Sequence, residues 1–116
     1  MAVHPSLVKR DKYLQYKYGI TLKQYNDLLD KQDGVCYICR RSPKQVGHNL
    51  HVDHDHKTMV IRGLLCTFCN RRVIGRHRDP VLFTRAASYL LGPSHRGAPT
   101  YIVPTKKKKR KKRKRK

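Results

Sequence analysis

Apolar residues recur at helical spacing near the start of the chain and predict a helix over residues 7–18. Leu7, Leu14 and Tyr18 share one face of this segment, and Ser6 precedes it as a candidate cap. The glycine that follows Tyr18 is expected to end the helix.

A second helix is predicted after Thr21. Thr21 and Gln24 match a capping box, in which each side chain bonds to the backbone of the other residue. The apolar residues behind the box form one stripe, and Asp33-Gly34 ends the pattern. The stripe is expected to face the core; its members are Leu22, Tyr25, Leu28 and Leu29.

The middle of the chain changes to a strand-like pattern. Residues 36–49 are interrupted by proline and glycine and are predicted to form a loop. Residues 50–56 and 59–65 are predicted as two short strands joined near Lys57-Thr58, since the second (MVIRGLL) is apolar and β-branched at its start. A helix is expected to follow over residues 66–77.

The last predicted helix starts at Asp79-Pro80, a cap followed by proline at the first helical position, and ends at Gly92-Pro93. Its predicted buried face consists of Val81, Leu82, Ala86, Tyr89 and Leu90. The predicted organisation is an N-terminal basic helix or arm (1–17), a main domain (18–92), a Pro/Gly linker (93–105) and a Lys/Arg tail (106–116) that is disordered until it meets an anion.

Charge narrows the range of partners. The 116 residues contain 28 Lys and Arg against seven acidic residues, all Asp, and the last eleven residues are all basic. A chain this basic is expected to bind a polyanion, because binding releases counterions. We interpret this polyanion as DNA or RNA. The alternative is that the basic tail serves only to keep the protein soluble.

Composition indicates one small domain without a membrane segment. Hydrophobic residues make up 38% of the chain and there is no Trp, so the core is modest and a metal would help to stabilise it. No apolar run approaches the roughly 18 residues of a membrane helix, and the N-terminus does not resemble a signal peptide. We therefore expect an intracellular, cytoplasmic protein.

Two CxxC pairs, Cys36-Cys39 and Cys66-Cys69, suit one tetrahedral metal site. A tight turn brings the two cysteines of a pair together, and Zn²⁺ accepts four sulfurs at about 2.3 Å in a structural site. The segment between the pairs is longer than in most zinc ribbons and has room for the predicted hairpin. A redox motif or two disulfides are the alternatives. A redox motif, however, needs only one CxxC pair, and it needs a thioredoxin-like βαβ pattern, which is missing here. We predict structural Zn²⁺.

The segment HVDHDH, residues 51–56, contains two of the seven aspartates and three of the seven histidines. On a regular strand Asp53 and Asp55 would lie opposite His54 and His56, but a kink could bring Asp53 and His54 toward one site. A carboxylate and an imidazole together suit a divalent cation and proton transfer. The alternative is that these residues complete the zinc site or stabilise a turn.

The ordered motifs YGIT, GVCYIC, HVDHDH, RGLLCTFCN and DPVLFTRAASYLL resemble the recombination endonuclease VII family, a phage-associated branch of the HNH, or ββα-metal (His-Me finger), nucleases. The resemblance implies an α+β fold: a small zinc-stapled ββα-metal domain with flanking helices. It also implies a metal-dependent DNA endonuclease, with branched or recombination-intermediate DNA as a candidate substrate. The alternative function is a non-catalytic zinc-stapled nucleic-acid-binding protein.

The resemblance also implies roles for individual residues. The four cysteines hold the structural Zn²⁺, and Asp53 and Asn70 are similar to the ligands of a catalytic Mg²⁺ or Mn²⁺. His54 is similar to the general base that activates water. His56 is similar to the second histidine of the motif, which contacts phosphate or the surroundings of the metal.

Basic and aromatic residues near these motifs are predicted to contact DNA. Phosphate contacts are expected at Arg62, Arg71, Arg72, Arg76, Lys106, Lys107 and Lys108, with a solvated surface charge as the alternative for each arginine. Three tyrosines in the first helix suit stacking on bases, but packing against the core is favoured; these are Tyr13, Tyr16 and Tyr18.

The other two residues of HVDHDH that carry an assignment are Asp55 and His51: Asp55 is expected to orient its neighbours or to be a solvated charge, and His51 is expected to be structural.

The sequence also departs from the best-known branch of the family. No carboxylate follows Asn70 before Asp79, and the segment after Leu91 is short and polar. The metal coordination of that branch is therefore not carried over in full, and a homodimer stays an open alternative.

Overall fold

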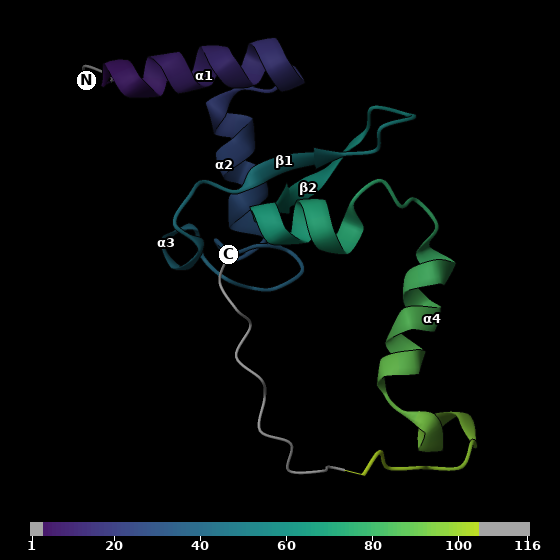
Figure 1. The fold of residues 1–116 in the computed structure, drawn as a ribbon. Coiled ribbons are helices and arrows are strands. Elements are labelled where there is room, and N and C mark those ends of the chain that lie inside the picture. Colours follow the sequence, from purple (N-terminus) through teal and green to yellow (C-terminus); the bar gives the residue numbers. More distant parts are fainter. Residues whose placement is uncertain (1–3, 105–116) are drawn as a thin grey trace, which may run out of the picture. The chain divides into compact units, whose positions relative to one another are not determined.

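The structure is a computed structural model that describes residues 4–104, and it divides the chain into two compact units, Met1–Arg78 and Asp79–Lys116 (Figure 1). The first unit has the predicted fold class, a small α+β domain with a β-hairpin, flanking helices and a four-cysteine cluster. Its elements are α1 (Pro5–Tyr18), α2 (Leu22–Lys31), α3 (Pro43–Val46), β1 (His51–His54), β2 (Ile61–Leu65) and η1 (Cys69–Ile74).

The first helix, α1, starts earlier than the sequence predicts. His4 is its cap, with a side chain that accepts a hydrogen bond from the Ser6 backbone N–H, and Pro5 occupies the first helical position. The prediction of Ser6 as the cap is therefore wrong. Leu14 is buried, but Leu7 is 45% exposed, so only the C-terminal half of the predicted apolar face reaches the core.

The second helix, α2, has the predicted capping box. The Thr21 hydroxyl accepts from the Gln24 N–H at 3.1 Å, and the Gln24 side chain accepts from the Thr21 N–H at 2.8 Å. Tyr25 is the buried residue of the stripe, and its hydroxyl donates to the Leu50 carbonyl at 2.6 Å. The rest of the stripe packs against the core with partial burial: Leu22, Leu28 and Leu29.

The two strands pair as an antiparallel hairpin, each shorter than predicted. The register shifts between Asp53, which is opposite Gly63, and His54, which is opposite Ile61. A bulge of this kind bends a strand and redirects its side chains. Regular alternation therefore fails here, and Val52 and Asp53 are both 5% exposed. The extra residue of the bulge, Arg62, lies on β2, so the kink expected in β1 near Asp53 and His54 stays a prediction.

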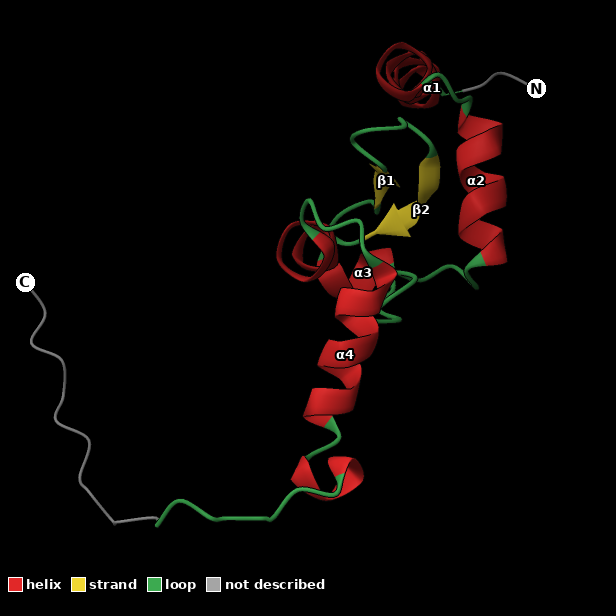
Figure 2. Cartoon of the chain, turned by 90° about the vertical axis from the view of Figure 1, so that its right-hand side faces the viewer, coloured by secondary structure: helices red, strands yellow, loops and turns green. Residues whose placement is uncertain are grey.

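Gln32, directly after α2, attaches that helix to the outer edge of β2, and Figure 2 shows α2 beside the strands. Its side-chain N–H groups donate to the carbonyls of Val35 at 3.0 Å and Leu64 at 2.9 Å, and its oxygen accepts from the Leu64 N–H at 2.8 Å. These bonds satisfy the backbone groups that an edge strand leaves unpaired. A Cβ on Gly63 would lie 2.9 Å from the Gln32 side-chain oxygen, so the close fit requires glycine there.

Two other predictions for the first unit need correction. Residues 36–49 are not all loop, because Ser42 and Gln45 form a second capping box that starts the one-turn helix α3. The helical segment after β2 covers residues 67–74 and ends at Gly75, short of the predicted residue 77. Its hydrogen bonds are of the wide π type, with the Gly75 N–H donating to the Asn70 carbonyl at 3.0 Å.

The second unit contains α4 (Pro80–Leu90) and η2 (Pro93–Arg96). Asp79 caps α4 as predicted and accepts from the Val81 N–H at 2.9 Å. The predicted buried face is wrong: all its residues are exposed, namely Val81, Leu82, Ala86, Tyr89 and Leu90. Within the described part of this unit only η2 packs on the helix, through Arg96, whose guanidinium lies 5.0 Å from the Tyr89 ring centroid.

No helix in residues 4–104 has the length and apolar character needed to cross a membrane. The basic tail, including Lys106, Lys107 and Lys108, lies outside the described residues.

Candidate functional site

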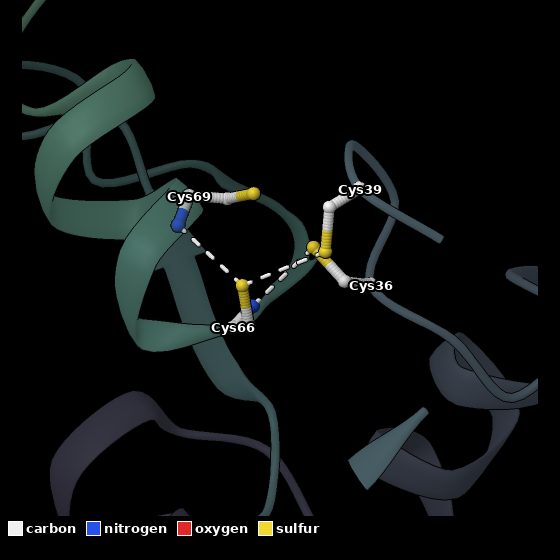
Figure 3. Close-up of side chains that lie close together, drawn as sticks. All are labelled: Cys36, Cys39, Cys66 and Cys69. Atoms are coloured by element: carbon white, nitrogen blue, oxygen red, sulfur yellow. Dashed lines mark hydrogen bonds between the residues drawn. The ribbon is translucent and has the colours of Figure 1, made fainter. Parts of the chain in front are cut away.

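Four cysteine sulfurs meet in the first unit, two from the loop after α2 and two from the end of β2 and the start of the following helix (Figure 3). All four sulfurs lie within 4.8 Å of one another, and the Sγ atoms of Cys39 and Cys66 are 3.7 Å apart. Tetrahedral Zn²⁺ with bonds of about 2.3 Å requires sulfurs about 3.8 Å apart. The predicted set of Cys36, Cys39, Cys66 and Cys69 is therefore confirmed as a cluster suited to structural zinc.

Electrostatics in the cluster also suit a cation. Burial raises the pKa of the Cys39 thiol, but hydrogen bonds from Arg41, Cys36 and Cys66 together lower this pKa to about 6. Burial, together with the neighbouring sulfurs, raises the pKa of the Cys69 thiol. Sulfurs this close cannot all ionise without repulsion, and a divalent cation removes that repulsion.

Backbone bonds attach the cysteine cluster to the hairpin. The Tyr37 N–H donates to the Leu64 carbonyl at 3.3 Å, and the Cys66 N–H donates to the Cys36 sulfur at 3.4 Å. Cys66 directly follows β2, and Asn70 directly follows Cys69. The sulfurs therefore fix both the end of the hairpin and the start of the segment that carries Asn70.

Asp53 lies at the β-bulge with its carboxylate bound by Arg62. The Arg62 Nε donates to Oδ2 at 2.8 Å and Nη2 donates to Oδ1 at 3.1 Å, while Nη2 also reaches the His54 carbonyl at 3.4 Å. Such two-pronged bonds hold a carboxylate in a fixed orientation. Each carboxylate oxygen has a second lone pair, so Asp53 keeps the capacity to accept another ligand. The sequence predicted a phosphate contact for Arg62 and missed this pairing.

The imidazoles of His54 and His56 lie side by side, with ring centroids 4.8 Å apart. The Tyr18 ring of α1 is 6.4 Å from His54. Within residues 4–104 neither imidazole has a hydrogen-bond partner, so the nitrogens of His54 are available to take a proton from water or to contact phosphate.

Asp55 holds the turn of the hairpin. Its carboxylate accepts from the backbone N–H groups of Lys57 at 2.8 Å and Thr58 at 3.0 Å, and from the Arg78 Nε at 2.9 Å. These donors, the Thr58 N–H foremost, hold the pKa of Asp55 well below its usual range. The residue therefore orients its surroundings, and the reading as a solvated charge is wrong.

His51 connects β1 to the segment after β2. Its Nε2 lies 2.8 Å from the Thr67 hydroxyl, which is also 3.2 Å from the His48 Nε2. Burial lowers the pKa of His51, and the nearby positive charges of His48, Arg71 and Lys17 lower it further. The expected structural role agrees with these contacts. Sequence reasoning did not single out His48 or Thr67, because partners this distant in the chain leave no local pattern.

Asn70 and Asp53 line different pockets. Asn70 borders a pocket of about 460 Å³ together with His51 and Arg71, whereas Asp53 borders one of about 410 Å³ with Arg62. The structure therefore groups Asp53, His54 and His56 on the hairpin. Asn70 lies on the segment that directly follows the last of the four cysteines.

The remaining predicted DNA contacts lie on the segment after the zinc cluster. Arg71, Arg72 and Arg76 are exposed, and Arg72 borders a third pocket with Phe68. Their side chains are accessible to a phosphate backbone. Of the three tyrosines expected to pack against the core, only Tyr18 does so, since Tyr13 is 50% exposed and Tyr16 is 91% exposed.

Comparisons with known proteins agree with this arrangement. A family model described as "Recombination endonuclease VII" matches residues 11–92. The chain is similar to two proteins named "Gene 59 protein": the one from Mycobacterium phage L5 is 49% identical over 77 residues, and the one from Mycobacterium phage D29 is 47% identical over 77 residues. Each alignment covers 66% of this chain and 46% of the relative, so the chain spans about half the length of the curated relatives it matches. No solved structure matches the chain.

Proposed function

Because the chain belongs to the recombination endonuclease VII family, we propose that it is a metal-dependent endonuclease that hydrolyses phosphodiester bonds in DNA. The observation that carries the proposal is the bulged hairpin. It presents Asp53 and His54 beside a four-sulfur site whose last ligand, Cys69, directly precedes Asn70. A protein that only bound DNA would not need this combination of residues.

Asp53 and Asn70 offer the oxygen atoms that Mg²⁺ and Mn²⁺ prefer. When bound, a divalent cation supplies stabilisation of the negative charge that develops on the attacked phosphate and on the leaving oxygen. Arg62 orients the Asp53 carboxylate through its two hydrogen bonds. The wide turn at Asn70 is a local distortion of a kind often found at functional sites.

His54 acts as the general base and takes a proton from the attacking water. Its ring has no hydrogen-bond partner in residues 4–104, which leaves it accessible to water. His56, whose ring is adjacent, contacts the phosphate. General base catalysis contributes about 10²–10⁴-fold to a rate. The products are expected to carry 5′ phosphates and 3′ hydroxyls.

The exposed arginines after Asn70 would hold the phosphate backbone without selecting a sequence. Branched or recombination-intermediate DNA is the substrate class that the family description suggests. Cleavage of a four-way junction, a flap and a linear duplex of the same sequence separates this substrate class from ordinary duplex DNA.

A second candidate function is DNA binding without catalysis. Two observations favour it: Arg62 already bonds both oxygens of Asp53, and Asn70 borders a different pocket from Asp53. In that case the zinc frame and the basic surface would bind DNA, and Asp53 would serve only to anchor Arg62.

Nicking of supercoiled plasmid by the zinc-loaded full chain, with and without Mg²⁺, tests the proposal. We expect His54→Ala to slow Mg²⁺-dependent nicking about 10²–10⁴-fold while DNA binding is retained. His95→Ala is the matched control, because this exposed histidine lies in η2, outside the proposed site, and should nick at the wild-type rate. If the wild type binds the plasmid but does not cut it with Mg²⁺ or Mn²⁺, the second function replaces the first.

A further inference from the structure

A pocket of about 460 Å³ lies between α1 and the segments that carry His51 and Asn70. Its volume is within the usual range for ligand sites in proteins, about 300–1,000 Å³. We call it the α1 pocket. Its polar lining comes from Arg10, Tyr13 and Lys17 on α1, His51 on β1, and Asn70 and Arg71 on the segment after the zinc cluster.

All the permanently charged side chains that line the α1 pocket are positive. Arg10, Lys17 and Arg71 border it, and none of the seven aspartates of the chain does. A pocket lined by cations and no carboxylate selects an anion.

Lys17 and Tyr13 form the donor pair at the accessible side of the pocket. The Lys17 ammonium donates to the Tyr13 hydroxyl at 3.1 Å and lies 5.6 Å and 5.5 Å from the ring centroids of Tyr13 and Tyr18. Lys17 takes part in none of the ion pairs found in residues 4–104, whereas Arg62 and Arg78 are each paired with an aspartate. The Lys17 ammonium therefore has no counter-charge within the described part of the chain.

The helix that carries these donors is firmly attached to the rest of the unit. The Asp11 carboxylate accepts from the Leu22 N–H at 2.8 Å, at the start of α2. The Arg10 guanidinium lies 4.6 Å from the Tyr25 ring centroid, and Leu14 is 2% exposed in the core. These contacts position the donors before a ligand binds, which lowers the entropy cost of binding.

The α1 pocket adjoins the residues proposed to be catalytic. Asn70 borders it directly, and Tyr18, also in its lining, places its ring 6.4 Å from His54. A DNA strand that presents one phosphate to His54 and Asn70 therefore runs beside α1.

We propose that the α1 pocket binds a backbone phosphate that flanks the scissile bond, with the Lys17 ammonium and the Tyr13 hydroxyl as its main donors. The inference rests on DNA being the substrate. It assigns a positioning role to α1, on which Tyr13 and Lys17 are exposed one turn apart while Leu14 is buried in the core.

Salt-dependent binding of the full chain to a duplex oligonucleotide, without Mg²⁺ and with zinc retained, tests the proposal. Loss of one phosphate contact lowers the slope of log binding constant against log salt concentration by about 0.9. We expect this change in Lys17→Ala. Lys17→Arg, which keeps the charge, should keep the slope. Lys12→Ala is the matched control, because Lys12 is an exposed lysine of α1 outside the pocket lining, and its slope should equal that of the wild type.

The hydroxyl has its own pair of variants. Tyr13→Phe should weaken binding about two- to tenfold with an unchanged slope, because it removes a neutral hydrogen bond. Tyr16→Phe, which alters an exposed tyrosine outside the pocket lining, should bind as the wild type does. Thermal unfolding of every variant verifies that the fold is retained.

Equal slopes for Lys17→Ala and Lys12→Ala overturn the proposal; a pocket that serves only free phosphate ions would give this result. Because binding is measured without Mg²⁺, the outcome does not depend on catalysis. A protein that cuts plasmid but whose two lysine variants bind alike refutes the α1 pocket alone. If the protein cuts no DNA but Lys17→Ala shows the slope change, the α1 pocket proposal stands and the nuclease proposal is refuted.

Discussion

The helices α2 and α4 start alike but have different surroundings. Each begins with a side-chain cap, Thr21 in α2 and Asp79 in α4, and each has an apolar stripe. In α2 the stripe places Tyr25 in the core, whereas in α4 the stripe residue Tyr89 is 70% exposed. The comparison shows that caps and periodicity determine where a helix forms, while burial depends on partners from distant parts of the chain.

The same contrast separates the two units. The first, Met1–Arg78, is held by four sulfurs and by long-range bonds such as those of Gln32. In the described part of the second unit, Asp79–Lys116, the contacts are local, such as that of Arg96 with Tyr89. Disruption of the first kind of contact should therefore unfold a whole unit, and disruption of the second kind should not.

Loss of the cysteine cluster should have the largest effect on the stability of the first unit. Structural zinc supplies on the order of 10 kcal/mol of apparent binding free energy, which in a small domain is folding free energy. We expect Cys66→Ser to lose zinc and to unfold the first unit, while α4 keeps its helical character. Amide hydrogen exchange resolved along the chain, with zinc content measured alongside, shows both effects. Retention of cooperative unfolding without bound metal would mean that the core alone suffices.

Gln32 should have the next largest effect. Its replacement by alanine leaves the buried N–H and carbonyl of Leu64 without their partner. Each unsatisfied buried group costs about 1–3 kcal/mol, so we expect Gln32→Ala to lower the free energy of unfolding by about 2–4 kcal/mol. The matched control is Gln24→Ala, which alters an exposed glutamine of α2 and should cost about 1 kcal/mol or less. Equal losses in a urea titration would show that Gln32 does not anchor the hairpin.

The parts of the fold that could be predicted are those encoded by neighbours in sequence. The Thr21–Gln24 box, the Asp79 cap and the two CxxC pairs each lie within a few residues. Some wrong predictions concern chain ends or distant segments, whereas the Ser42–Gln45 box of α3 is a local pattern that was also missed. His4 replaces Ser6 as a cap through a side chain that seldom plays this role, and no local pattern shows that the face of α4 stays exposed.

The candidate site shows the same limit. The motif around Asp53 and His54 was recognisable, but the extra residue of the bulge, Arg62, lies on β2, and the expected kink in β1 stays a prediction. The pairing of Asp53 with Arg62 was not predicted, because it depends on which residue the bulge leaves unpaired on β2. The bridge of His48 and His51 through Thr67 was also missed. The convergence of Asp53 and Asn70 on one cation stays a prediction.

Tyr25 allows a finer test of the core contact that α4 lacks. Its hydroxyl bonds to the Leu50 carbonyl, and loss of such a bond costs about 1 kcal/mol, so Tyr25→Phe should be slightly less stable at neutral pH. Burial raises the pKa of Tyr25 above the ordinary value of 10.0. A raised tyrosine pKa stabilises the fold below pH 10, and this contribution is lost as the pH rises through the folded-state pKa.

The difference in unfolding free energy between wild type and Tyr25→Phe should therefore be constant near pH 7 and shrink above pH 10. Measurement of both proteins at each pH cancels the titration of the other tyrosines and lysines. A difference that did not change between pH 7 and pH 11 would show that the Tyr25 hydroxyl is not buried in solution.

The smallest effect is expected on the apolar face of α4. Leu90 is 83% exposed, and substitution of an exposed residue usually changes stability by less than about 0.5 kcal/mol. We therefore expect Leu90→Ser to leave the urea midpoint of the full chain nearly unchanged, whereas Leu14→Ser, which alters a leucine with 2% exposure on α1, should lower it strongly. If the two variants lost comparable stability, the apolar face of α4 would be packed on a partner in solution. The helices α2 and α4 would then differ only in which partner covers the apolar face. If Leu90→Ser leaves the urea midpoint unchanged over a range of protein concentrations, the apolar stripe of α4 does not pack against a partner.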